Sequence, residues 1–289
     1  MALQSGPTLT IAAAIKDNRI RQAFQQVATK IEVMCSAPPD LRLPLLLIGP
    51  PGIGKTQIVR NSLLQYGERV NIGNPRNPWE LYGLFSKYRN ARSLLIDDSE
   101  HLARSEPCAN LAKQALSPPY TVTWDDSKAD TDSFNTKFSL IWISNVDYRD
   151  EGSVAESMGP HFAALVSRGL KPIWIGGTDN EIFQYTCWLA TEGGMLFNRR
   201  VGQTESELAI RWFIDNRNFL EDVTPRGMSH IIDRIKMTKS KPQHREMLLK
   251  ELLLPEQRPV EQQIEELVIP TIIQPAKSPR KPLIRENGI

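Results

Sequence analysis

The sequence predicts an α/β fold, in which helices cover both faces of a parallel sheet, followed by a small helical domain. Three observations support this fold class. Short, strongly apolar runs alternate with helical stretches up to residue 177, which is the pattern of parallel strands joined by crossover helices. Most of these runs end in glycine or polar residues, where open parallel sheets build ligand sites. Beyond Gly177 the alternation stops and helix-start signals replace it.

The first predicted element is an amphipathic helix that ends before the turn "SAPPD". Its apolar residues recur at spacings of four and three, which places them on one helix face. They are Ile20, Phe24, Val27, Ile31 and Met34.

Five strands and two helices are expected in the rest of the α/β domain, residues 1–177. The helices are expected over 56–66 and 77–88. The strands are the apolar runs "LPLLLIG" (43–49), "RVNI" (69–72), "SLLIDD" (93–98), "SLIWISN" (139–145) and "KPIWIGG" (171–177).

The helical domain is expected over residues 178–238. "TDNE" at 178–181 and "TESE" at 204–207 both have the spacing of a capping box. "TPRG" gives an N-cap threonine, Thr224, with proline at the first helical position. The apolar face of that helix comprises Met228, Ile231, Ile232 and Ile235.

Residues 239–289 are expected to be a linker and a disordered tail. Proline is dense here, and it is mixed with charge. "HREMLLKELLLPEQ" (244–257) could form one amphipathic helix. The basic stretch at 236–245 is interpreted as a solvated linker.

Composition excludes several classes of protein. Hydrophobic residues make up 40% of the chain and charged residues 24%, and the net charge is +2, so neither a membrane protein nor a strongly basic nucleic-acid binder is indicated. No apolar run is long enough to span a membrane. Cys35, Cys108 and Cys187 are isolated, which fits a reduced, cytoplasmic location and offers no zinc site.

The strongest motif is "GPPGIGKT", which follows an apolar strand and precedes a helix. It matches G-x-x-x-x-G-K-[ST], a loop whose backbone N–H groups surround phosphates. Lys55 would reach the β- and γ-phosphates of ATP, and Thr56 would ligate Mg²⁺. The predicted nucleotide-binding residues are Gly49, Pro50, Pro51, Gly52, Ile53, Gly54, Lys55, Thr56 and Gln57.

Acidic residues follow the strand "LLID". Asp97, at the strand end, is predicted to hold Mg²⁺ opposite Thr56. Either Asp98 or Glu100 would orient the attacking water, with Asp98 favoured.

The order of these motifs resembles the AAA+ ATPases over about residues 10–238. "GPPGIGKT" resembles the family's Walker A and "LLIDDSEHL" its Walker B. "LIWISN" is similar to the sensor 1 strand, with Asn145 at its end. "ALVSRGL" and "TPRG" resemble segments that carry functional arginines, here Arg168 and Arg226. Arg199 and Arg200 compete for such a role.

The resemblance implies that ATP drives closure between the sheet domain and a helical lid in an oligomer of identical subunits. Arg168 would then complete the site of a neighbouring subunit, as an arginine finger does. Arg226 would contact phosphate, which would offset its unfavourable position in the first turn of a helix.

Two features depart from the family pattern. Asp97-Asp98 replaces the frequent Asp-Glu pair, which puts the rate of hydrolysis in question but not nucleotide binding. Residues 118–137 look like a hairpin inserted between Walker B and sensor 1, with an acidic loop that would repel DNA.

Three hypotheses for function stay open at this point. The first is an ATPase directed at DNA or at a DNA-bound replication or mobile-element complex. The second is an ATPase that remodels a protein partner, and the third is an ATP-dependent switch that scarcely hydrolyses its nucleotide.

Overall fold

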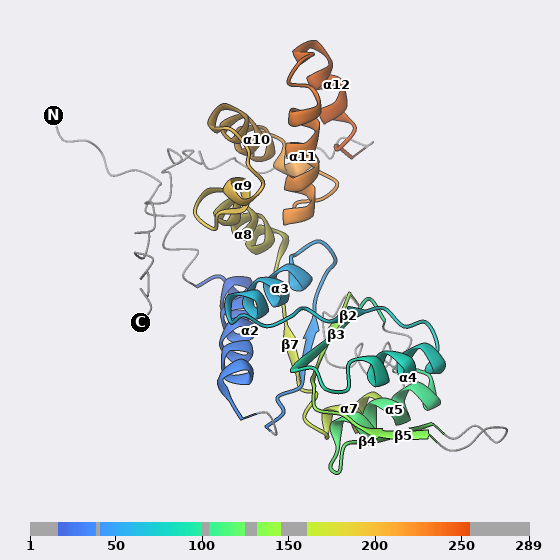
Figure 1. Ribbon diagram of the computed structural model, residues 1–289. Helices are drawn as coiled ribbons and strands as arrows, with labels where there is room; N and C mark the ends of the chain where they lie inside the picture. Colours follow the sequence, from blue (N-terminus) through green and yellow to red (C-terminus); the bar gives the residue numbers. More distant parts are fainter. Residues whose placement is uncertain (1–16, 39–40, 100–103, 125–131, 146–160, 255–289) are drawn as a thin grey trace, which may run out of the picture.

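In the computed structural model, a five-stranded sheet has helices on both faces, and a further group of helices lies above it (Figure 1). The structure describes residues 17–38, 41–99, 104–124, 132–145 and 161–254. The sheet has the strand order β2-β3-β6-β1-β7, and every pairing is parallel. Its strands are β1 (Leu45–Ile48), β2 (Ile72–Gly73), β3 (Ser93–Asp97), β6 (Ser139–Ser144) and β7 (Pro172–Trp174).

Helices α2 (Arg19–Ser36) and α3 (Lys55–Gln65) cover one face of the sheet. All five residues of the predicted apolar face of α2 are buried there. They pack against alternate strand residues such as Leu45, Leu47 and Ile141, as expected where successive side chains of a strand point to opposite faces.

The other face is covered by α4 (Pro78–Lys87), α5 (Glu106–Leu116) and α7 (Phe162–Val166). Here the intervening strand residues, Leu46, Ile96 and Trp142 among them, form a second core. Burial on both faces explains why the strands are continuous apolar runs.

Two details of the α/β unit can be compared with the expectations. The predicted strand over 69–72 is shorter than expected and lies later, at Ile72–Gly73. The insertion over 118–137 contains the expected hairpin, β4 (Thr121–Trp124) paired antiparallel with β5 (Asp132–Asn135). Its acidic loop lies mainly outside the described residues.

The helical unit begins with α8 (Asp179–Thr191), followed by α9 (Met195–Asn198), α10 (Gln203–Asp215) and α11 (Pro225–Met237). The capping box at Thr178 is confirmed, and so is the N-cap at Thr224. The capping box predicted at 204–207 is wrong: α10 begins two residues earlier than a Thr204 cap requires, and its N-cap is Gly202, which has no side chain to accept a hydrogen bond.

The helical unit continues beyond the boundary expected at residue 238. A short 3₁₀ turn, Pro242–His244, leads into α12 (Arg245–Lys250). Leu249 is buried in the same core as α10 and α11, and Leu253 forms a β-bridge with Leu220. The residues expected to be a linker therefore pack against the helices, because the apolar side of 245–253 contacts their core. The division of the chain into separately folding domains stays a prediction.

No helix within the described residues is both long and apolar enough to cross a membrane.

The packing of α12 predicts a difference between two residues of that helix. Leu249→Ala should lower the free energy of unfolding by about 2–5 kcal/mol, because it removes a buried side chain and leaves a cavity. Met247→Ala, on the exposed side of α12, is the matched control and should change it by less than about 0.5 kcal/mol. Denaturant unfolding monitored by circular dichroism measures both. Equal effects of the two substitutions would contradict the described packing.

Candidate functional site

The candidate site lies at the carboxyl ends of the strands, where β1 passes into the glycine-rich loop. Gly49 follows β1 directly, and a Cβ atom at this position would lie only 1.9 Å from the carbonyl oxygen of Ile175, so any side chain would collide with it. Gly52 and Gly54 have φ angles of 80° and 104°, which glycine adopts at no steric cost. The loop ends at Gly54, the N-cap of α3. Its glycines therefore serve both close approach and turning.

Lys55 is the first residue of α3, and only 4% of it is exposed. Its ammonium group donates to the carbonyl oxygens of Gly49 at 2.7 Å and Pro50 at 2.8 Å, and to Asn145 Oδ1 at 2.8 Å. A buried cation requires such acceptors. The ammonium group is thus held by carbonyl oxygens of its own loop and by the residue that follows β6.

Thr56 and Asp97 are paired across the site. The Thr56 hydroxyl donates to Asp97 Oδ2 at 2.8 Å. Burial raises the pKa of Asp97 above its ordinary value, although the hydrogen bond from Thr56 opposes this shift. A hydroxyl and a half-buried carboxylate at this distance are oxygen ligands of the kind that Mg²⁺ prefers. The described residues contain no cluster of three or more His, Cys, Asp or Glu side chains that could hold a metal ion.

Asn145 connects the lysine to the second aspartate. Its amide nitrogen donates to Asp98 Oδ1, while its oxygen accepts from Lys55. Strand order explains the contact: β6 lies between β1 and β3, so the residue after β6 stands between the residues that follow its neighbours. Asp98 has a φ of 52°, an uncommon conformation for a residue other than glycine.

The side chains of two other predicted nucleotide-binding residues, Ile53 and Gln57, point away from Lys55 and Thr56. The Ile53 side chain is fully buried in the core beneath the loop, where it anchors the backbone. The Gln57 side chain is exposed and donates to Asn61 Oδ1 at 2.7 Å. Glu100 lies outside the described residues.

The start of α11 reaches the same loop. The Arg226 backbone N–H donates to the Gly52 carbonyl oxygen at 3.2 Å. A Cβ built on Gly52 would lie 2.6 Å from Thr224 Oγ1 and 2.9 Å from the Arg226 Cβ. The helical unit and the glycine-rich loop are therefore in direct contact. The sequence predicted Arg226 near this loop, but not the backbone hydrogen bond to Gly52.

The remaining arginines lie away from the loop. Arg168 is exposed and precedes β7, whose first residue, Pro172, pairs with Leu46 near the start of β1. It therefore stands at the amino ends of the strands, opposite the loop, and its guanidinium donates to the Ala164 carbonyl oxygen at 2.6 Å. Arg199 pairs with Asp233 within the helical unit at 2.6 Å. Arg200 follows it, exposed and with a φ of 54°.

Comparisons with known proteins agree with this architecture. No family model matches the chain. An uncharacterised 36.7-kDa protein from the nrdC–mobD intergenic region of Enterobacteria phage T4 is 26% identical over 209 residues, 68% of this chain and 64% of that protein. The structure of NtrX from Brucella abortus in complex with ADP superposes with a TM-score of 0.52 at 13% identity, covering 84% of this chain and 56% of NtrX. The chain has the AAA+ P-loop NTPase fold.

The superposition on a RuvB mutant structure from Thermotoga maritima covers 78% of this chain and 68% of the RuvB chain, with a TM-score of 0.47 and 15% identity. The matched part of this chain spans less than two thirds of the length of the phage protein and little more than half of the length of NtrX. The superposition on NtrX supports the fold, and the roles of individual residues stay predictions.

The contact between Gly52 and α11 predicts opposite effects at two glycines. Gly52→Ala should lower the free energy of unfolding by more than about 1 kcal/mol, since the new side chain needs a left-handed backbone and meets Thr224. Gly83→Ala lies in the exposed middle of α4 with open space around it, and should raise stability by about 0.5–1 kcal/mol. Chemical denaturation measures both. If Gly52→Ala were as well tolerated as Gly83→Ala, the described contact would be wrong.

Proposed function

We propose that this protein binds ATP with Mg²⁺ and hydrolyses it to drive conformational work in an oligomer. The observation that carries the proposal is the convergence of Lys55, Asn145 and the Thr56–Asp97 pair at the end of the glycine-rich loop. These groups come from the ends of two neighbouring strands, β3 and β6, and from the helix after the loop. Their chemistry matches a triphosphate and its metal.

Each group has a defined part in binding. The loop N–H groups and the start of α3 would face the phosphates. Lys55 would exchange the carbonyl oxygens of Gly49 and Pro50 for phosphate oxygens. Thr56 and Asp97 would hold Mg²⁺, which supplies charge neutralisation between the phosphates when bound.

Activation of water is assigned to Asp98. Its carboxylate is held by the Asn145 amide, which fixes its direction at the edge of the site. Asn145 would also turn toward the γ-phosphate when Lys55 moves. Glu100 remains the alternative base, as the sequence indicated.

The arginines suggest how subunits cooperate. The backbone of Arg226 touches the phosphate loop of the same chain, so its side chain can serve the nucleotide bound there. Arg168 lies at the opposite end of the strands, where it could serve only a neighbouring subunit. Self-assembly into a ring or filament is part of the proposal.

The preferred client is DNA or a DNA-bound replication or mobile-element complex. The similarity to a phage protein supports a mobile-element setting.

A second candidate is the remodelling of a protein partner. One observation favours it: Trp79, on α4, is 63% exposed. It packs edge-on against Trp124 of the inserted hairpin and stacks on Tyr82, with ring centroids 5.5 and 6.0 Å apart. Exposed aromatic clusters are typical of protein contact sites. A switch that scarcely hydrolyses ATP is the third possibility.

The function is tested by separating binding from turnover. Lys55→Ala should abolish ATP binding in a calorimetric titration, because the charge that faces the phosphates is lost. Asp98→Asn should bind ATP normally and turn it over about 10²-fold more slowly, or slower still. ATPase rates with and without single- and double-stranded DNA then decide the client. Unchanged ATP affinity in Lys55→Ala would contradict the nucleotide assignment, and a larger loss in Glu100→Gln would reassign the base.

The position of Arg168 predicts complementation between two inactive variants. Arg168→Ala should bind ATP but hydrolyse it about 10³-fold more slowly, or slower still, as expected for a missing arginine finger. Mixing it with Lys55→Ala should restore part of the activity, because an intact loop can then meet an intact arginine across an interface. Arg199→Ala, whose arginine pairs within the helical unit, is the control and should retain activity. No activity at any mixing ratio would exclude this arrangement.

A further inference from the structure

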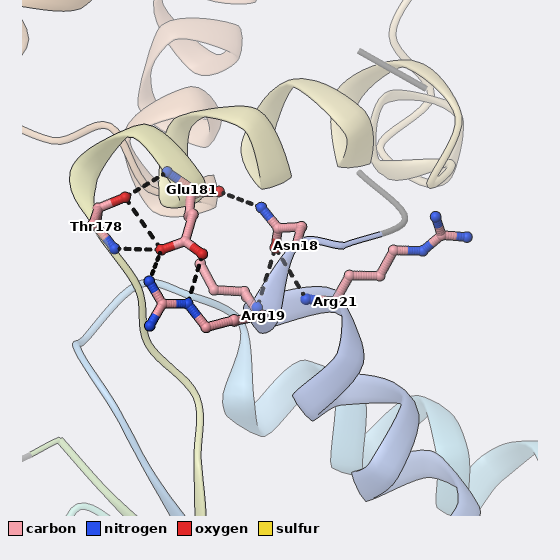
Figure 2. Close-up of polar contacts among 6 residues, drawn as sticks. Asn18, Arg19, Arg21, Thr178 and Glu181 are labelled. Atoms are coloured by element: carbon pink, nitrogen blue, oxygen red, sulfur yellow. Dashed lines mark hydrogen bonds and ion pairs between the residues drawn. The ribbon is translucent and has the colours of Figure 1, made fainter. Parts of the chain in front are cut away.

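The start of α8 is tied to the start of α2 by a two-pronged ion pair (Figure 2). Arg19 Nε and Nη2 donate to the two carboxylate oxygens of Glu181 at 2.8 and 2.9 Å. The same carboxylate accepts from the backbone and hydroxyl of Thr178 in the capping box. Glu181 therefore orders its own helix and binds it to the other one.

Asn18 adds a second connection at the same place. It is only 2% exposed, and its amide nitrogen donates to the Glu181 carbonyl oxygen at 2.9 Å while its oxygen caps α2 (Figure 2). Further along, the Arg21 guanidinium lies over the Trp188 ring, 4.8 Å from its centroid. The two helices are thus connected over more than one turn.

Helix α8 contributes to two cores at once. Ile182 and Tyr185 pack into the core between the sheet and α2. Phe183 and Cys187 pack into the core of the helical unit. A shift of α8 on α2 therefore also shifts Phe183 and Cys187 in the core of the helical unit, because packed interiors do not deform freely.

A buried hydroxyl carries the connection from α8 to α11. Thr186 is fully buried, and its Oγ1 lies 2.9 Å from the carbonyl oxygens of both Ile182, in its own helix, and Val223, so its one hydrogen is shared between them. Val223 precedes Thr224, the N-cap of α11, and two residues later the Arg226 N–H reaches Gly52. A continuous set of contacts thus runs from Arg19 to the phosphate loop.

We propose that Arg19 and Glu181 are positioning residues, which hold the first turn of α11 against Gly52 through α8 and Thr186. Their side-chain hydrogen bonds are with each other and with Thr178, away from the glycine-rich loop. Their expected effect on nucleotide affinity rests on the proposed function. Their expected effect on the hydrogen bond from the Arg226 N–H to Gly52 does not.

The exposure of the pair determines its size and its salt response. The Arg19 side chain is 68% exposed and that of Glu181 18%. The hydrogen bond from Arg19 is the main cause that lowers the pKa of Glu181. An exposed pair with this geometry is worth about two- to fivefold in an equilibrium, and salt screens it.

The direct test is hydrogen exchange of the nucleotide-free protein. Arg19→Ala should speed exchange in a peptide covering residues 223–228 by about two- to fivefold, and leave residues 230–237 of α11 unchanged. Arg19→Lys, which keeps the charge but loses the paired geometry, should lie between Arg19→Ala and the parent protein. Raising salt from about 0.05 to 0.5 M should speed the parent protein's exchange and leave Arg19→Ala unaffected.

Arg217→Ala is the matched control. Arg217 also binds the first turn of α8, through Asn180 Oδ1 at 2.7 Å, but it does so from within the helical unit. It should leave exchange in 223–228 unchanged. Equal exchange in Arg19→Ala and the parent protein would overturn the proposal, as would equal acceleration in Arg19→Ala and Arg217→Ala.

The nucleotide measurement is a double-mutant cycle. Arg19→Ala should weaken ATP binding by about two- to fivefold in the parent protein, and cause no further loss in Arg226→Ala. Independent, additive losses would overturn the coupling to α11. If the parent protein bound no ATP at all, the proposed function would fail while the exchange result still decided the positioning role.

Discussion

The burial of the Lys55 ammonium group is the constraint on which the rest of the site depends. A cation that is almost fully enclosed needs oxygen acceptors on several sides, and it has them in the Gly49 and Pro50 carbonyls and in Asn145. Those acceptors fix the loop, the end of β6 and, through Asn145, Asp98. On the proposed function, phosphate oxygens would replace the carbonyl oxygens, and the charge of Lys55 would stay paired.

Strand order converts distant sequence segments into one site. Because β6 lies between β1 and β3, three strand ends deliver the loop, Asn145 and the two aspartates to adjoining positions. The two apolar cores hold these strands from both faces. The helical unit touches the site at Gly52. Helix α8 contributes both to the core between the sheet and α2 and to the core of the helical unit, and so connects the two.

Local signals in the sequence predicted much of this. The glycine-rich loop, the four buried strands and the capping box at Thr178 depend on residues close together in the chain, and the structure has them where they were expected, whereas β2 is shorter and lies later. The same signal failed at 204–207, since Gly202 can cap α10 by backbone conformation alone. Contacts across the chain could not be predicted: Arg19 and Glu181 are 162 residues apart, and the capping box accounts for only part of what the Glu181 carboxylate does. The amphipathic helix expected within 244–257 is present as α12. Its packing on the helical unit through Leu249 was not predicted, because proline and charge nearby resemble a linker.

The most direct test of the account is a crystal structure of the protein with Mg²⁺ and a non-hydrolysable ATP analogue. We expect Lys55 Nζ to contact β- and γ-phosphate oxygens in place of the Gly49 and Pro50 carbonyls. We also expect the Thr56 hydroxyl to contact the metal ion in place of Asp97 Oδ2. Phosphates bound elsewhere, or a Lys55 that keeps its present carbonyl partners while the loop holds the analogue, would contradict the account.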